Sequence, residues 1–333
     1  MGFTVKCGSR SKARCAGCAA IYYGDWVAIG RSGIVGGDAG RYSFYFLTLT
    51  APSFGAVHRV PKSAESNVQR CRCGVVHTVE DVGLRGVPID PETYDYAGQV
   101  AWNRDAGVLW SNTVRRLRDV WESVEFFMVR EWQARGVLHV HVLLRVELRE
   151  RATSEAVRMR AASAVAWSKV DGSLVEWGQE GTDCQPIRAD GDAQRRAWYI
   201  AKALNYSLKD VVLDAAAAPA AVSAHQNRLR AAAERMRCSA LCEGGYCGSR
   251  AHRNYGARGH VVSASRRTLT RPGWSFTGLT RTRLRRERFL WWLLNGATPT
   301  EREARGWPGE ASVMESAAVA AREEVAALCP GGP

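Results

Sequence analysis

The run GVLHVHVLLRV at 136–146 constrains the fold more than any other part of the chain. Its valines and leucines favour a β-strand, and successive side chains of a strand point to opposite faces. His139 and His141 therefore share one face, while the residues between and beside them make the opposite face wholly apolar. The apolar face predicts packing on a core, and the two adjacent imidazoles predict a functional patch on the other side.

A second predicted strand, EFFMVREW at 125–132, precedes the histidine run, and the intervening QARG predicts a short turn. The two strands should therefore pair as an antiparallel hairpin. Alternation then brings Glu131 beside His139 and His141. Two imidazoles and one carboxylate can hold a divalent cation and leave positions for substrate oxygens. The alternative is a pair of structural histidines next to a surface carboxylate.

The net charge and the lengths of the apolar runs limit the kinds of molecule that the protein can bind. The 333 residues carry a net charge of +13, which favours a polyanionic partner, either nucleic acid or an acidic membrane surface. No apolar run reaches the roughly 20 residues of a membrane helix, and the N-terminus does not resemble a signal peptide. We therefore expect no membrane association and a cytoplasmic location.

Ten cysteines in such a chain indicate metal binding rather than disulfides, because the cytoplasm is reducing. A C-x-x-C pair lets two thiolates reach one zinc ion. The candidate zinc ligands form three groups, which are Cys7, Cys15 and Cys18, then Cys71, Cys73 and His77, then Cys238, Cys242 and Cys247 with His252 close behind.

The ligand sets of these groups stay open at this point. The first group lacks a local fourth ligand, so Cys71, Cys73 or His77 could complete it. The third group could close on His252 alone. The alternative for all three is buried thiols that pack as small apolar residues.

The chain divides into a cysteine-rich segment (1–40), a catalytic domain (41–214) and a basic C-terminal region (215–333). An irregular insertion with the second cysteine group interrupts the catalytic domain at about 56–92. Local patterns predict a strand at 42–50 and helices at 93–121, 151–166, 192–210, 279–294 and 312–328. The inward side of the 93–121 helix should carry Trp102, Leu109, Trp110, Val114, Leu117 and Trp121.

The predicted helix at 192–210 carries Tyr199, Lys202, Tyr206 and Lys209 at spacings of three, four and three. At 100° per residue these four side chains fall within an arc of roughly 80°. A phenol has a pKa of about 10 and is a poor nucleophile, but a neighbouring ammonium group stabilises its phenolate. One helix face could therefore deliver an activated tyrosine. The alternative is an amphipathic helix whose Tyr and Lys stems cover apolar surface.

Residues 250–290 contain eleven arginines and one acidic residue, Glu287. Arginines in such excess neutralise phosphates and give salt-dependent affinity for nucleic acid. The candidate DNA-binding residues are Arg266, Arg267, Arg281, Arg283, Arg285 and Arg286.

Four segments in this order resemble the motifs of one enzyme family. They are FLTLTAPSFGAVH (46–58), EWQARGVLHVHVLLRV (131–146), YIAKALNYSLKD (199–210) and GARGHVVSASRR (256–267). The chain resembles the HUH (histidine–hydrophobic–histidine) endonucleases, and more closely the rolling-circle replication initiators of actinobacterial plasmids and integrative elements.

The resemblance implies an α+β fold, with an RRM-like antiparallel sheet, helices on one side, zinc-binding insertions and a basic helical C-terminal region. It implies that Glu131, His139 and His141 hold Mg²⁺ or Mn²⁺. Tyr206 would attack the scissile phosphate, with Lys209 and Lys202 stabilising the developing charge. Tyr199 would be a packing residue or a second nucleophile.

The resemblance also implies partners and competing functions. The partners would be single-stranded and double-stranded origin DNA, a host helicase and polymerase, and a second copy of the chain. The alternatives are an HUH transposase or relaxase, or a zinc-containing DNA-binding regulator without catalysis. Relaxases generally place the tyrosine before the histidines, whereas here it follows them.

Overall fold

The computed structural model describes residues 15–35, 39–63, 69–187, 219–244 and 247–294. Its helices are α1 (Ala16–Arg31), α2 (Tyr96–Arg118), α3 (Ser154–Ala162), α5 (Ala220–Arg235), α6 (Arg250–Arg253) and α7 (Arg281–Leu294). Its strands are β1 (Tyr42–Thr50), β2 (Glu125–Trp132), β3 (Leu138–Glu147), β4 (Val165–Trp167), β5 (Leu174–Glu176), β6 (Gly178–Ile187) and β7 (Val262–Ala264). Three short 3-10 helices lie at Ala39–Arg41, Val79–Leu84 and Leu148–Glu150.

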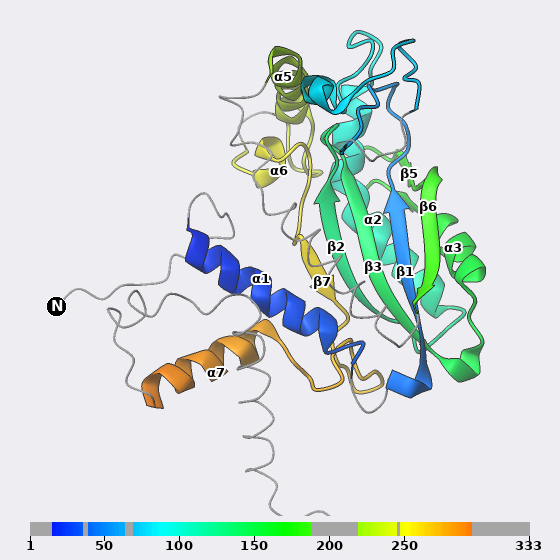
Figure 1. The fold of residues 1–333 in the computed structure, drawn as a ribbon, viewed down its shortest axis with the longest axis vertical. Helices are drawn as coiled ribbons and strands as arrows, with labels where there is room; N and C mark the ends of the chain where they lie inside the picture. The colour runs from blue at the N-terminus through cyan, green and yellow to red at the C-terminus, as the bar shows by residue number, and fades with distance from the viewer. Residues whose placement is uncertain (1–14, 36–38, 64–68, 188–218, 245–246, 295–333) are drawn as a thin grey trace, which may run out of the picture.

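Five strands form one sheet in the order β6-β1-β3-β2-β7, and every pair of neighbours is antiparallel (Figure 1). β4 and β5 form a separate two-stranded hairpin. The predicted strands at 42–50 and 125–132 are confirmed, and so is the hairpin of β2 with the histidine strand β3. The fold is thus α+β, as expected.

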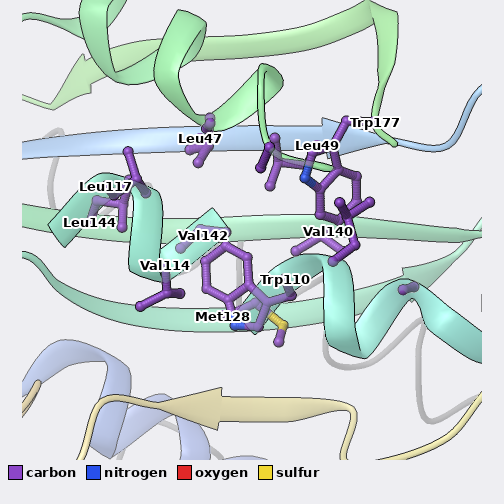
Figure 2. Close-up of a cluster of buried hydrophobic side chains, with 14 of the residues drawn as sticks. Leu47, Leu49, Trp110, Val114, Leu117, Met128, Val140, Val142, Leu144 and Trp177 are labelled. Atoms are coloured by element: carbon purple, nitrogen blue, oxygen red, sulfur yellow. The ribbon is translucent and has the colours of Figure 1, made fainter. Parts of the chain in front are cut away.

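One face of the sheet packs against α2 and α3 (Figure 2). All six side chains predicted to face inward from the helix at 93–121 are buried in this core. Asp95 begins α2 by accepting a hydrogen bond from the Gly98 backbone N–H, and Arg115, Arg116 and Arg118 lie at its negatively polarised end. This core fixes β3, and therefore fixes which face of the sheet carries the histidines.

The opposite face carries a second core, so the expectation of helices on one side only is wrong. Ile29 and Ile34, from α1 and the turn after it, pack there with Phe127 and Leu143 of the sheet and with Trp274. Figure 1 shows α1 alongside β7 and α7. The sequence pattern of β3 gave no sign of this second core. The apolar residues of the core come from segments that lie far apart in the sequence.

Three predicted helices differ at their ends. The helix predicted at 93–121 is α2, which runs from Tyr96 to Arg118, so Trp121 lies just beyond it. The helix predicted at 151–166 begins at Ser154, behind the Thr153 N-cap, and ends at Ala162, because Val165–Trp167 form strand β4. The helix predicted at 279–294 is α7 and begins at Arg281. The predicted helices at 192–210 and 312–328 lie outside the described residues. No described helix combines the length and apolarity that crossing a membrane requires.

Candidate functional site

The histidine patch lies on the face of β3 that also bears the second core, at the end where β1 and β2 finish. The register pairs Glu131 and Thr50 with His139 from the two neighbouring strands, and pairs Thr48 with His141. The strand register therefore places Glu131 beside both histidines, as predicted. Because register fixes facing, all five side chains lie on the same side of the sheet.

The side chains make direct contacts. His141 Nε2 lies 3.1 Å from Glu131 Oε2, and the two imidazole centroids are 4.5 Å apart. Phe46 stacks on His141 with its ring centroid at 5.5 Å. The Nδ1 atoms of His141 and His139 face the hydroxyls of Thr48 and Thr50 at 3.4 and 3.3 Å. These threonines orient the rings and leave Nε2 of His141 directed at the carboxylate.

Gln133, in the turn before β3, makes a second contact to His139, and Arg135 in turn contacts Gln133. The Gln133 amide nitrogen lies 3.3 Å from His139 Nδ1, and Arg135 donates to the Gln133 side-chain oxygen at 3.0 Å. Neither residue was predicted as part of the site from the sequence, although both lie in the EWQARG segment.

The electrostatics put His139 and Glu131 in forms that can bind a cation. Burial, aided by the charge of His141, lowers the pKa of His139 to about 3, so its imidazole is neutral at neutral pH. Burial raises the pKa of Glu131, but its hydrogen bond with His141 and the charges of His141 and Lys62 outweigh burial and lower that pKa overall. Lys62 is exposed and was also missed. A neutral imidazole and an ionised carboxylate are the forms that can donate electron pairs to a divalent cation.

A tighter group surrounds the second set of cysteines. Among the described residues, His58, Cys71, Cys73 and His77 bring their ligand atoms within 4.8 Å of one another. His77 Nδ1 also lies 3.2 Å from Asp81, which leaves its Nε2 facing Cys73 at 3.3 Å. The fourth member is thus His58, and neither described cysteine of the first group, Cys15 or Cys18, joins it; Cys7 lies outside the described residues.

The third set closes on His252, as the spacing allowed. Cys238, Cys242, Cys247 and His252 also bring their ligand atoms within 4.8 Å of one another. His252 donates its Nδ1 proton to the Ala233 carbonyl at 2.7 Å, which leaves Nε2 facing Cys247 at 3.0 Å and Cys242 at 3.5 Å. A fixed Nδ1–H with a free Nε2 is the usual arrangement of a metal-binding histidine.

In each set, hydrogen bonds lower the pKa of at least one thiol, Cys71 in one and Cys242 in the other. Burial raises the pKa of Cys71, but hydrogen bonds from the backbone at Cys73 and Arg59 outweigh it and lower the pKa to about 7. Backbone hydrogen bonds at Cys238 and Gly244 lower the pKa of Cys242 to about 6. Both sets therefore fit a metal such as zinc, which binds thiolate and neutral imidazole. We name them the 58–77 cluster and the 238–252 cluster.

Glu131, His139 and His141 are arranged more loosely. In the described part of the chain, the groups of at least three donors within 4.8 Å are the 58–77 and 238–252 clusters, and this trio is not among them. His139 Nδ1 faces Thr50 and Gln133 rather than the Glu131–His141 pair. Three donors in an open arrangement leave room for other ligands.

The predicted DNA-binding arginines fall into two kinds. Arg281 is engaged internally, because its Nε lies 3.3 Å from the buried carboxylate of Asp25, which Arg288 also contacts at 2.6 Å. Arg283 pairs with Glu287 at 2.6 Å. The remaining four are exposed, and they are Arg266, Arg267, Arg285 and Arg286. The sequence could not separate these kinds, since Asp25 lies 256 residues from Arg281. Tyr199, Lys202, Tyr206 and Lys209 lie outside the described residues.

These features define an α+β protein with an open His/Glu group on its sheet, two Cys/His clusters and an arginine-rich flank. The chain belongs to the RepSA family, described as "Replication initiator protein, pSAM2", whose model matches residues 2–322. It is 33% identical over 242 residues to a replication initiator protein of Streptomyces ambofaciens. That match covers 60% of this chain and 51% of the relative, so the chain spans about half the length of that curated protein. No solved structure has significant similarity to it.

Proposed function

We propose that this protein initiates rolling-circle replication by nicking and rejoining single-stranded DNA at a plasmid origin. The observation that carries the proposal is the pairing of Glu131 with His141, beside His139, on an open sheet face in a member of a replication initiator family. A net charge of +13 supports a DNA substrate. Such a reaction belongs in the cytoplasm.

The proposed reaction transfers a phosphodiester onto a tyrosine. The Tyr206 hydroxyl loses its proton and attacks phosphorus, the bond from phosphorus to the 3′ oxygen breaks, and that oxygen takes up a proton. The products are a 5′-phosphotyrosine link and a free 3′-hydroxyl, which primes a polymerase. Lys209 and Lys202 stabilise the phenolate and the developing charge. The link keeps the bond energy, so the reverse step rejoins a strand.

A divalent cation, Mg²⁺ or Mn²⁺, supplies positive charge at the scissile phosphate when it is bound. Glu131, His139 and His141 are the residues that would hold it. Thr48 and Thr50 orient the two imidazoles. In the two clusters we propose zinc, with two thiolates and two imidazoles in the 58–77 cluster and three thiolates and one imidazole in the 238–252 cluster.

The exposed arginines are proposed to bind single-stranded and double-stranded origin DNA through phosphates. A host helicase and polymerase, and a second copy of the chain, are the further partners that the proposal expects.

The test uses a 3′-labelled single-stranded oligonucleotide from the origin, since the link forms on the downstream 5′ end. With Mn²⁺, the full chain should form a covalent adduct that Tyr206→Phe abolishes. Tyr199→Phe is the matched control and should keep the adduct. If Tyr206→Phe keeps the adduct and Tyr199→Phe removes it, the nucleophile is Tyr199.

A second candidate is a zinc-containing DNA-binding regulator, which the two closed clusters and the exposed arginines favour. It predicts duplex binding in metal-chelating buffer with no strand cut under any condition.

A further inference from the structure

Residues 265–274 form a short hairpin loop at the end of the sheet opposite the histidine patch. The Trp274 backbone N–H donates to the Ser265 carbonyl, and that of Thr268 donates to Arg271, both at 2.9 Å. Ser265 in turn donates to the Phe126 carbonyl at the start of β2. The loop therefore leaves the sheet directly after β7, beside the start of β2 (Figure 1).

The base of this loop is held by burial, hydrogen bonds and a close backbone crossing. Trp274 is buried, and its indole N–H lies 3.1 Å from the carbonyls of both Ile29 and Gly30. Gly273 has φ +76°, and a Cβ there would lie 2.5 Å from the Arg267 backbone nitrogen, so the close crossing of the loop requires glycine. A loop with such a base holds its tip in a defined position.

The tip combines an apolar end with positive flanks. Leu269 is fully exposed, at 107%, between exposed Thr268 and Thr270 and next to exposed Arg266 and Arg267. The chain has no acidic residue between Glu243 and Glu287. Among the described residues, no carboxylate lies within ion-pair distance of Arg266 or Arg267. A single exposed leucine on a protein surface is common. Here the leucine lies beside two arginines, and a DNA duplex offers a partner for each, since its phosphates can bind the arginines and its stacked bases can accept the leucine.

We propose that the 265–274 loop is a pin that unpairs duplex DNA: Arg266 and Arg267 bind phosphates, and Leu269 inserts between bases. This inference rests on the proposed function, since it explains how a single strand reaches the histidine patch. Gly273, at the base of the pin, contacts Glu125, and β2 runs from there to Glu131 at roughly 3.3 Å per residue. The base of the pin therefore lies about 20 Å from the patch. That separation corresponds to about six base pairs.

The experiment measures permanganate reactivity of thymines in a supercoiled plasmid that carries the DNA flanking this gene. The full chain is added without catalytic cation, so no cleavage is needed. Wild-type protein should make thymines reactive. Leu269→Ser should lower that reactivity about fivefold or more, because unstacking bases costs a few kcal/mol and the inserted leucine offsets this cost. The affinity for the plasmid should stay nearly unchanged. Leu241→Ser is the matched control, since Leu241 is 96% exposed on the 238–252 cluster and should leave reactivity unchanged.

A double variant, Arg266→Gln with Arg267→Gln, should weaken binding and reduce the salt dependence by about two phosphate contacts. Unchanged thymine exposure in Leu269→Ser would overturn the pin, and so would an equal loss in Leu241→Ser. A change in oligomeric state on Leu269→Ser would instead assign the tip to a protein contact and overturn it too. Cleavage of a single-stranded oligonucleotide, run in parallel, separates this failure from that of the nicking proposal.

Discussion

The histidine patch and the two Cys/His clusters hold the same kinds of side chain but arrange them differently. In each cluster four ligand atoms converge within 4.8 Å, whereas Glu131, His139 and His141 stay more open. Four protein donors fill a tetrahedral zinc and leave no position for substrate, while three donors leave open positions. We propose that this difference separates metal sites that stabilise the fold from a metal site that contacts a substrate.

The largest expected effect distinguishes these roles directly. His141→Ala should lower oligonucleotide cleavage by roughly 10³-fold, because a cation on the phosphate contributes several kcal/mol to the transition state. Zinc content and melting temperature should stay close to wild type. His260→Ala, an exposed histidine outside the patch, is the control. Full activity in His141→Ala would remove the patch from the mechanism.

Breaking a cluster should act on the fold instead. Cys242→Ser should remove about one zinc per chain and lower the melting temperature by about 10 °C, because a structural metal contributes several kcal/mol of folding free energy. Cys184→Ser is the control for zinc content, since Cys184 is buried outside both clusters. A Cys242→Ser protein with its full zinc content would contradict the assignment.

The two clusters should also release zinc at different pH values. Zinc needs thiolates, so protons compete with zinc for each cluster, and they compete at higher pH where the thiol pKa is higher. The pKa of Cys71 is about 7 and that of Cys242 about 6, so the 58–77 cluster should release zinc first. A chromogenic chelator can follow zinc release from each cluster separately. Cys242→Ser leaves the 58–77 cluster intact, and Cys73→Ser leaves the 238–252 cluster intact. The reverse order would contradict the comparison.

The smallest effect concerns orientation of the patch. Thr50→Val removes the hydroxyl that faces His139 Nδ1 and should weaken Mn²⁺ binding about tenfold, as loss of a partner behind a ligand does. Thr50→Ser keeps the hydroxyl and should bind like wild type. Calorimetric titration with Mn²⁺ gives both affinities, and equal weakening in the two variants would leave no role for the hydroxyl.

The sheet could be predicted from the sequence because its signals are local. Short runs of aromatic and apolar residues predicted β1 and β2 to the residue. The short QARG turn predicted the hairpin of β2 with β3 and the approach of Glu131 to the histidines. The same local logic found the 238–252 cluster, whose four residues span 15 positions.

Contacts that no local sequence pattern marks could not be predicted in this way. His58 joins Cys71 across an irregular loop with no periodicity, and the internal pairing of Arg281 depends on Asp25 in another helix. The second core has the same origin, because α1 and Trp274 reach the sheet from both ends of the chain.

The central claim is that the histidine patch is an open cation site that a DNA phosphate completes. Electron paramagnetic resonance of Mn²⁺ added to the zinc-loaded full chain tests it most directly. We predict one bound Mn²⁺ per chain, tighter binding when single-stranded origin DNA is present, and loss of both in a His139→Ala, His141→Ala double variant that keeps its zinc. Mn²⁺ binding that survives in the double variant would contradict the account.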